Sequence, residues 1–203
     1  MSASRLGVAP KPPSSDDEAF KRELVGLIPH LRAFARTLTG DPTAADDLAQ
    51  DAMMKAWDAR ASYQMGTNMK AWTFMILRNQ FYSEKRRSWR QSQLDQEAAE
   101  RTLVAVDDPE APVALDELRQ ALKTLPEEQR EALILVGAGG FAYEEAAEIC
   151  GCAVGTVKSR VSRARRALLA TLEKGGYARD GQAAGDAMRT ILGEADRLSG
   201  ARE

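Results

Sequence analysis

The stretch that most constrains the fold of this chain is residues 143–169, with the sequence YEEAAEICGCAVGTVKSRVSRARRALL. Its small and apolar residues predict one helix over about 144–150 and a second over about 154–172. Gly151 stands between them, where the turn requires a residue that tolerates positive φ, and Ala147 is small enough for a close helix crossing. The stretch therefore predicts a helix-turn-helix, a unit that places its second helix in the major groove of DNA.

The second helix of this pair has one apolar stripe and one polar, basic face. At helical spacing the stripe consists of Val157, Val161, Ala164 and Leu168, and we expect it to be buried. The other positions carry hydroxyl and cationic side chains, which suit base edges and phosphates. A merely Arg-rich exposed helix is the alternative. The candidate DNA-contacting residues are Thr156, Lys158, Ser159, Arg160, Ser162, Arg163 and Arg166.

The net charge argues against a protein that binds DNA tightly by itself. The 203-residue chain has a formal net charge of −2, whereas an autonomous DNA-binding domain carries an excess of positive charge. Basic residues crowd 158–166 and 70–90, while acidic residues crowd 46–51 and 95–117. Two separate basic sites on an acidic body predict weak DNA binding alone and stronger binding when another protein holds the chain in place.

The sequence also argues against several other classes of protein. No apolar run approaches membrane-spanning length and no signal-peptide core is present, which favours a cytoplasmic protein without a membrane partner. Cys150 and Cys152 have no His partners, so we expect buried small side chains and no metal site. His30, the one histidine, is expected to be structural on a core helix. We find no catalytic set, and we expect no enzyme activity, no cofactor and no small-molecule substrate.

Helical periodicity predicts an all-α fold of two small domains joined by a flexible acidic linker, and no strand pattern appears. The first domain is expected over 16–91 and the second, which contains the helix-turn-helix, over 113–174. Residues 92–112 are the expected linker. The Pro/Ser-rich residues 1–15 are expected to be disordered, and 175–203 form a polar tail with at most a short amphipathic helix.

Helix-breaking and N-capping residues are expected to set the helix boundaries in the first domain. Pro29 is expected to kink or divide a helix, and Gly40 to end it. Asp41 and Asn68 are expected N-caps, the first of them followed by Pro42 at the first turn.

Aromatic and cationic side chains interleave between residues 63 and 90. This mixture suits single-stranded nucleic acid, whose bases stack on rings while its backbone follows positive charge. The pattern also fits a core aromatic at Trp72 and a basic helix end that complements the helix dipole. Composition alone leaves both interpretations open.

Three segments resemble the extracytoplasmic-function (ECF) sigma factors of bacterial RNA polymerase. They are AADDLAQDAMMKAW, KAWTFMILRNQFYSEKRR and LPEEQREALILVGAGGFAYEEAAEICGCAVGTVKSRVSRARRAL. The resemblance covers roughly residues 20–172. Within it, GGFAYEEAAEICGCAVGTVKSRVSRAR is most similar to the EcfG-like general stress subgroup of alphaproteobacteria.

The resemblance implies a promoter-specificity factor that binds core RNA polymerase at the β′ clamp and β flap. The polymerase contact would be made by Asp46, Asp47, Leu48, Gln50 and Asp51. The first domain would melt and read the −10 element, and the helix-turn-helix would read the −35 element. The −10 residues would be Gly66, Thr67, Asn68, Met69, Lys70, Trp72, Arg78, Asn79, Tyr82, Lys85 and Arg86.

The resemblance also implies a NepR-type anti-sigma factor as a partner besides polymerase and promoter DNA. A sigma-like decoy that binds the anti-sigma factor and never touches DNA is the main alternative. The tail after residue 175 is too short for the receiver domain of such a decoy, and the basic 158–166 surface would serve it no purpose. A dimeric helix-turn-helix repressor is a third possibility, but it leaves the Trp/Arg segment of the first domain unexplained.

Overall fold

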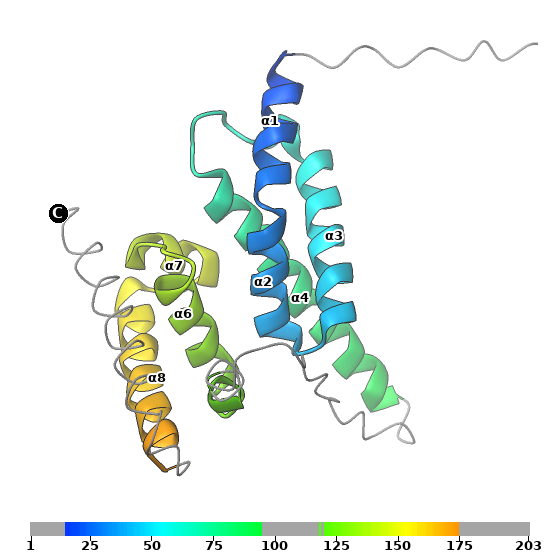
Figure 1. Ribbon diagram of the computed structural model, residues 1–203. Coiled ribbons are helices and arrows are strands. Elements are labelled where there is room, and N and C mark those ends of the chain that lie inside the picture. Colours follow the sequence, from blue (N-terminus) through cyan, green and yellow to red (C-terminus); the bar gives the residue numbers. More distant parts are fainter. Residues whose placement is uncertain (1–14, 95–117, 119, 175–203) are drawn as a thin grey trace, which may run out of the picture.

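The computed structural model describes residues 15–94, 118 and 120–174, and every regular element in these residues is a helix (Figure 1). The prediction of an all-α fold is therefore confirmed. Expectations for 1–14, 95–117 and 175–203 lie outside the described residues. The helices are α1 (Ser15–Gly26), α2 (Ile28–Thr39), α3 (Pro42–Asp58), the short 3-10 helix η1 (Arg60–Ser62), α4 (Met69–Leu94), α6 (Glu127–Gly137), α7 (Tyr143–Cys150) and α8 (Val154–Lys174).

Local residues set the helix ends of the N-terminal bundle, which comprises α1–α4. Pro29 divides two helices, since α1 ends at Gly26 and the proline occupies the first turn of α2. Gly40 ends α2 with φ of +73°. Asp41 and Asn68 are N-caps, because their side-chain oxygens accept hydrogen bonds of 2.7 and 3.0 Å from backbone N–H groups three residues on.

Aromatic residues fill much of the N-terminal bundle. Phe34 of α2 stacks on Phe74 of α4 with ring centroids 4.8 Å apart. At the other end, Phe20 of α1 meets the edges of Tyr63 and Trp72 at 5.6 and 6.1 Å. These contacts fix α4 and the loop that precedes it against α1–α3.

The C-terminal bundle comprises residues 120–174 and contains the helix-turn-helix at α7 and α8. Gly151 takes φ of +63° between the two helices, and the N–H of Cys152 donates to the carbonyl of Ala147 at 3.1 Å. The apolar stripe expected on α8 is at most 1% exposed, and it packs inside the bundle. The sequence-based boundaries and the buried face are thus confirmed.

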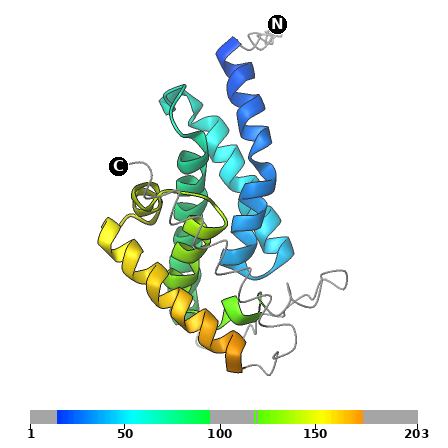
Figure 2. The same ribbon diagram turned by 60° about the vertical axis from the view of Figure 1, so that its left-hand side comes forward.

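The two bundles pack directly against each other (Figures 1 and 2). The helix α7 lies on α4 and α6 lies on α2. One continuous apolar cluster contains buried residues of both bundles, and in it Phe141 meets Phe74 edge to face at 5.0 Å. The sequence did not predict this packing.

Two expectations about single residues need correction. His30 is exposed on α2, so it is not a structural core residue: it falls on the solvent side of the stripe that Leu31 and Phe34 bury. Of the two cysteines, Cys150 is buried but Cys152 is only partly buried. None of the described helices is long and apolar enough to cross a membrane.

Candidate nucleic-acid and partner-binding surfaces

The outward face of α8 is open to solvent. Lys158, Ser159, Ser162, Arg163 and Arg166 are all exposed. Arg163 is held along the helix, because its Nε donates to the Ser159 carbonyl at 3.2 Å and its Nη2 to the Ser159 hydroxyl at 3.0 Å. The face therefore presents hydroxyl groups between cations, an arrangement that suits base edges flanked by phosphates.

Arg160 and Thr156 stand apart from this open face because both are only partly exposed. The Arg160 guanidinium pairs with Glu128 of α6, and its Nη1 lies 3.6 Å from the Cys152 sulfur. Arg160 therefore ties α8 to α6. Its place among the DNA-contacting residues stays a prediction.

The acidic helix α3 presents part of its predicted polymerase set to solvent. Asp47, Gln50 and Asp51 are exposed, while Leu48 is 3% exposed and belongs to the core. Asp46 accepts hydrogen bonds from Arg32 of α2, with 2.7 Å between Arg32 Nε and Asp46 Oδ1. Those bonds hold the pKa of the Asp46 carboxyl below its ordinary value.

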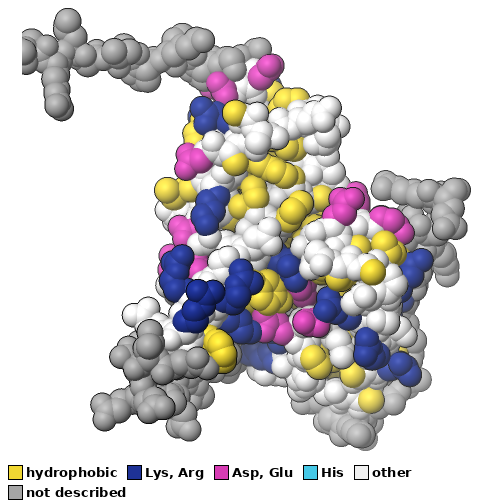
Figure 3. Space-filling model, turned by 180° about the vertical axis from the view of Figure 1, so that it is seen from behind, with side chains coloured by type: hydrophobic (Ala, Val, Ile, Leu, Met, Phe, Trp, Pro, Cys, Tyr) yellow, Lys and Arg dark blue, Asp and Glu magenta, His cyan; other side chains and the backbone are white. Residues whose placement is uncertain are grey.

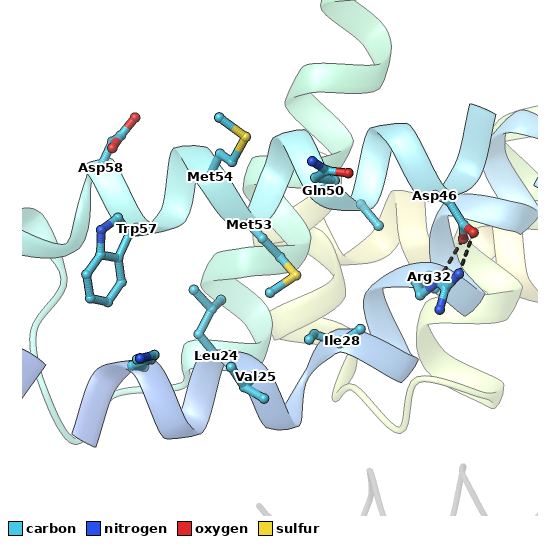
Figure 4. A pocket seen from close by; sticks show the side chains of 12 residues that line it. Leu24, Val25, Ile28, Arg32, Asp46, Gln50, Met53, Met54, Trp57 and Asp58 are labelled. Carbon is cyan, nitrogen blue, oxygen red and sulfur yellow. Dashed lines mark hydrogen bonds and ion pairs between the residues drawn. The ribbon is translucent and has the colours of Figure 1, made fainter. Parts of the chain in front are cut away.

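An apolar groove runs beside these acidic residues, between α1–α2 and α3 (Figure 4). The Arg32–Asp46 pair marks one end of it, and Trp57 and Asp58 mark the other. Two of its apolar residues are unusually exposed for their kind, Val25 at 50% and Met54 at 58%. The apolar lining is Leu24, Val25, Ile28, Ala49, Met53, Met54 and Trp57. Such a surface fits an apolar helix face from a partner protein.

The loop before α4 is exposed and fixed at both ends. Gly66 takes φ of +87°, and the Tyr63 hydroxyl donates to the Thr67 carbonyl at 2.7 Å. Gly66, Thr67 and Asn68 are exposed, but Met69 is 1% exposed, so its side chain supports the loop from the core and cannot line a pocket.

Four of the predicted −10 residues of α4 face the C-terminal bundle, as does Asn68 of the loop. The Lys70 ammonium donates to the Gly139 carbonyl at 2.7 Å, and Lys85 pairs with Glu127. Asn68 donates its amide to Glu145 at 2.7 Å. Arg78 and Tyr82 both donate to Glu131 and complete the set.

Glu131 is the most buried charged residue among those described, at 1% exposed. One carboxylate oxygen accepts from Arg78 Nε at 2.7 Å and the other from the Tyr82 hydroxyl at 3.3 Å. Burial raises the pKa of the Glu131 carboxyl, although the Arg78 charge opposes that rise. Burial and the neighbouring Glu131 charge likewise raise the pKa of Tyr82.

Three predicted −10 residues of α4 are exposed: Asn79, Arg86 and, although it pairs with Glu127, Lys85. Lys85 and Arg86 begin an exposed basic end of α4 that continues through Arg87 and Arg90. Lys and Arg side chains gather at this end of the molecule when it is seen from behind (Figure 3). Trp72 is partly buried in the aromatic cluster around Phe20, in keeping with the core interpretation of that residue.

Sequence reasoning anticipated apolar grooves for an anti-sigma helix but missed the position and lining of this one, and it missed the acidic partners of α4. Glu131 closes the polar segment EEQRE and directly precedes the apolar run ALILV, so no local sign in the sequence indicates that this one carboxylate is buried. Val25 and Met54 lie beside the buried stripes of α1 and α3. Their exposure can be recognised only when it is known how the two helices pair.

The chain matches two family models. Residues 26–91 match sigma-70 region 2 and residues 115–168 match sigma-70 region 4. The first range carries α2–α4 and the second carries the helix-turn-helix. The exposed faces of α3, α4 and α8 therefore lie within matched residues, whereas Leu24 and Val25 of the groove precede them.

Known proteins match over most of the chain. It is 44% identical over 176 residues to the ECF RNA polymerase sigma factor EcfG of Rhodopseudomonas palustris (strain TIE-1), a match that covers 87% of this chain and 96% of that protein. It is 34% identical to the ECF RNA polymerase sigma factor SigC of Mycobacterium tuberculosis, over 66% of this chain and 72% of the other.

A solved structure resembles it as well. The sigma factor RpoE of Bartonella quintana, crystallised with the anti-sigma factor NepR, is 46% identical with a TM-score of 0.70, over 77% of this chain and 98% of that one. Sequence and fold thus agree across both bundles. The chain belongs to the ECF family of RNA polymerase sigma factors.

Proposed function

We propose that this ECF sigma factor directs RNA polymerase to the promoters of general stress genes in the cytoplasm. The chain is not itself an enzyme; it directs transcription initiation by one. The similarity to EcfG over 87% of the chain carries the stress assignment. The open basic face of α8 is the structural observation that supports direct promoter recognition.

In this proposal α8 reads the −35 element. Lys158, Ser159, Ser162 and Arg163 approach base edges and phosphates, and Arg166 adds a phosphate contact farther along the helix. The exposure of all five side chains supports the assignment.

The loop at 66–68 and the outward residues of α4 read and melt the −10 element. Aromatic and cationic side chains suit an unpaired strand, and the energy of unstacking is offset by captured bases and phosphate contacts. Lys70, Arg78, Tyr82 and Lys85 can join this surface only when the C-terminal bundle moves away, because each now has a partner there.

Core polymerase binds the chain at two places. The β′ clamp docks on the exposed side of α3 and the groove beside it, and the β flap contacts the C-terminal bundle. Holding both DNA-reading surfaces on one enzyme raises the effective concentration of each for its promoter element, so neither needs to bind DNA tightly alone. The functional division that we propose is 16–91 and 113–174, with 92–112 as the connection.

We also propose a NepR-type anti-sigma factor as the silencing partner. The Bartonella quintana relative was crystallised with NepR, and this chain offers an apolar groove suited to a partner helix. Co-purification of the tagged chain with the NepR homologue of the same genome tests this partner. No complex at micromolar concentrations would refute it.

Run-off transcription tests the main function. Purified core polymerase with this chain should start transcription at one defined position on fragments upstream of stress-induced genes, and core polymerase alone should not. A decoy that only binds an anti-sigma factor, or a dimeric repressor, would give no transcript under the same conditions.

A further inference from the structure

We propose that the C-terminal bundle is an internal partner of α4: in the free chain it closes over the promoter-facing side of that helix, and the Glu131 carboxylate occupies Arg78 in place of a DNA phosphate. The inference rests on the −10 function proposed above for α4.

The contacts between the two bundles involve one face of α4 in the N-terminal bundle. Asn68 meets the C-terminal bundle directly before α4. Positions 70, 74, 78, 82 and 85 also meet it, and their spacing of three or four residues along α4 defines a single helix face. Every polar partner on the other side is an acceptor, either a Glu carboxylate or the Gly139 carbonyl. Acceptors are also what a DNA backbone would offer these same donors.

Arg78 is the side chain for which Glu131 and a DNA phosphate would compete most directly. Its guanidinium donates to Glu131 at 2.7 Å and lies 4.6 Å from the centroid of the Tyr82 ring. The side chain is only 16% exposed and its partner is fully covered. A guanidinium binds a carboxylate and a phosphate with the same kind of donor, and Glu131 already takes the Nε donor of Arg78, so a phosphate would have to compete with Glu131 for this side chain.

An apolar contact reinforces the closed arrangement. Phe141 is 3% exposed and meets Phe74 of α4 at 5.0 Å, while Lys70 lies over the Phe141 ring at 5.0 Å. Separation of the bundles would expose both rings to water, which costs free energy unless another surface covers them.

The Arg78–Glu131 ion pair selects the closed arrangement but adds little net stability to it. Desolvation of a buried pair offsets much of its attraction, and the raised pKa of Glu131 reflects that cost. Polymerase can therefore open the interface by binding the two bundles at separate places.

Closure is selective between the two DNA-reading surfaces. The α8 face and residues Asn79 and Arg86 stay exposed, whereas Lys70, Arg78 and Tyr82 are engaged and Lys85 is paired although 55% of its side chain is exposed. The free chain should consequently bind single-stranded DNA weakly even though its −35 face is accessible.

A distance measurement on the full chain tests closure. Spin labels on ketone-bearing side chains in place of Ser62 and Ala170, both exposed, leave the two cysteines intact. The wild type should give one narrow distance. Glu131→Gln should raise the ratio of open to closed chains at least about tenfold, because it removes a hydrogen bond between charged groups. Glu128→Gln removes a carboxylate from the same helix, one that pairs within the C-terminal bundle, and should leave the distance unchanged.

A binding measurement tests masking. A short fluorescein-labelled single strand of mixed sequence should bind Glu131→Gln at least about fivefold more tightly than wild type, and adding Arg78→Ala should abolish that gain. Glu127→Gln, at a partly exposed position opposite Lys85, is the second variant if Glu131→Gln unfolds, and it should shift both readouts in the same direction by a smaller factor.

A broad distance distribution in the wild type, or a distance unchanged in both Glu131→Gln and Glu127→Gln, would overturn closure, whether or not α4 binds promoter DNA. Opening without tighter strand binding would overturn masking. Run-off transcription by the wild type tests the proposed function separately. If the chain supports transcription but is never closed, closure is refuted and the proposed function stands.

Discussion

Glu131 lies between the polar turn EEQR and the apolar run ALILV of α6, and its carboxylate accepts hydrogen bonds from two side chains of α4. In a helix of the C-terminal bundle considered alone, a buried carboxylate would have to be neutralised or paired at a large cost. Arg78 provides the pairing from the other bundle. One residue therefore links the stability of the closed arrangement to the availability of a DNA-binding side chain.

Gly139 is a second residue that its surroundings restrict, here through neighbours in its own bundle. A Cβ added there would lie 2.5 Å from the Leu135 carbonyl oxygen and 2.9 Å from Cδ2 of Phe141. Gly139→Ala should therefore lower the free energy of unfolding by about 1–3 kcal/mol, measured by urea denaturation. Gly155→Ala, where nothing lies within 4 Å, is the matched control and should cause no loss. Equal stability of the two variants would contradict the packing around Phe141.

The two cysteines should differ in reactivity. Burial raises the pKa of the Cys150 thiol to about 12, whereas Cys152 is partly exposed. At pH 8 a disulfide reagent should label one thiol rapidly, and Cys152→Ser should abolish that fast phase. Because the folded state holds the Cys150 proton more tightly than an ordinary thiol with pKa 9.0, stability should fall as the pH rises from about 9 towards about 12. Rapid labelling of both thiols at pH 8 would contradict the burial of Cys150.

Residue-level features that depend on near neighbours could be predicted from the sequence. Asp41, Asn68 and Gly151 each act within three or four residues of the chain, so their roles as caps and turn follow from local chemistry. Arg78 and Glu131 lie 53 residues apart, and nothing local indicates that they meet. His30 was misplaced because helical periodicity does not settle residues at the edge of an apolar stripe.

At the scale of elements, α1, α2 and α3 together form the groove that a single helix pattern could not reveal. Each helix buries its main stripe, and the side chains flanking the stripes line the groove once the helices pair. The polymerase-binding assignment of α3 was made from its acidic residues, whereas the groove adds an apolar surface beside them. Predicting that surface needs the pairing, which helix periodicity does not give.

Met54 offers a test of this groove. Its side chain is 58% exposed, so Met54→Asp should leave the fold intact but weaken the complex with core polymerase by about tenfold or more, through a charge placed in an apolar contact. Thr43→Asp adds the same charge at an exposed position of α3 outside the groove lining and should bind as wild type does. Fluorescence anisotropy with labelled core polymerase measures both. Wild-type affinity of Met54→Asp would exclude the groove from the polymerase contact.

At the scale of the whole molecule, charge segregation acquires a structural meaning. The acidic residues of the C-terminal bundle face the basic residues of α4, so the free chain neutralises part of its own DNA-binding surface. The DNA affinity of this chain, whose net charge is −2, should therefore depend on how the two bundles are packed as well as on composition. The family resemblance identified both DNA-reading units from sequence, but their mutual packing required the structure.

The most direct test of promoter recognition is run-off transcription by the double variant Lys158→Ala/Arg163→Ala with core polymerase. Both side chains are exposed on α8, so the fold and the polymerase complex should persist while specific transcripts fall at least about tenfold. Arg22→Ala/Lys123→Ala removes the same two charges from exposed positions elsewhere and should transcribe as wild type does. Unchanged promoter choice and yield in the α8 variant would contradict the assignment of that face to the −35 element.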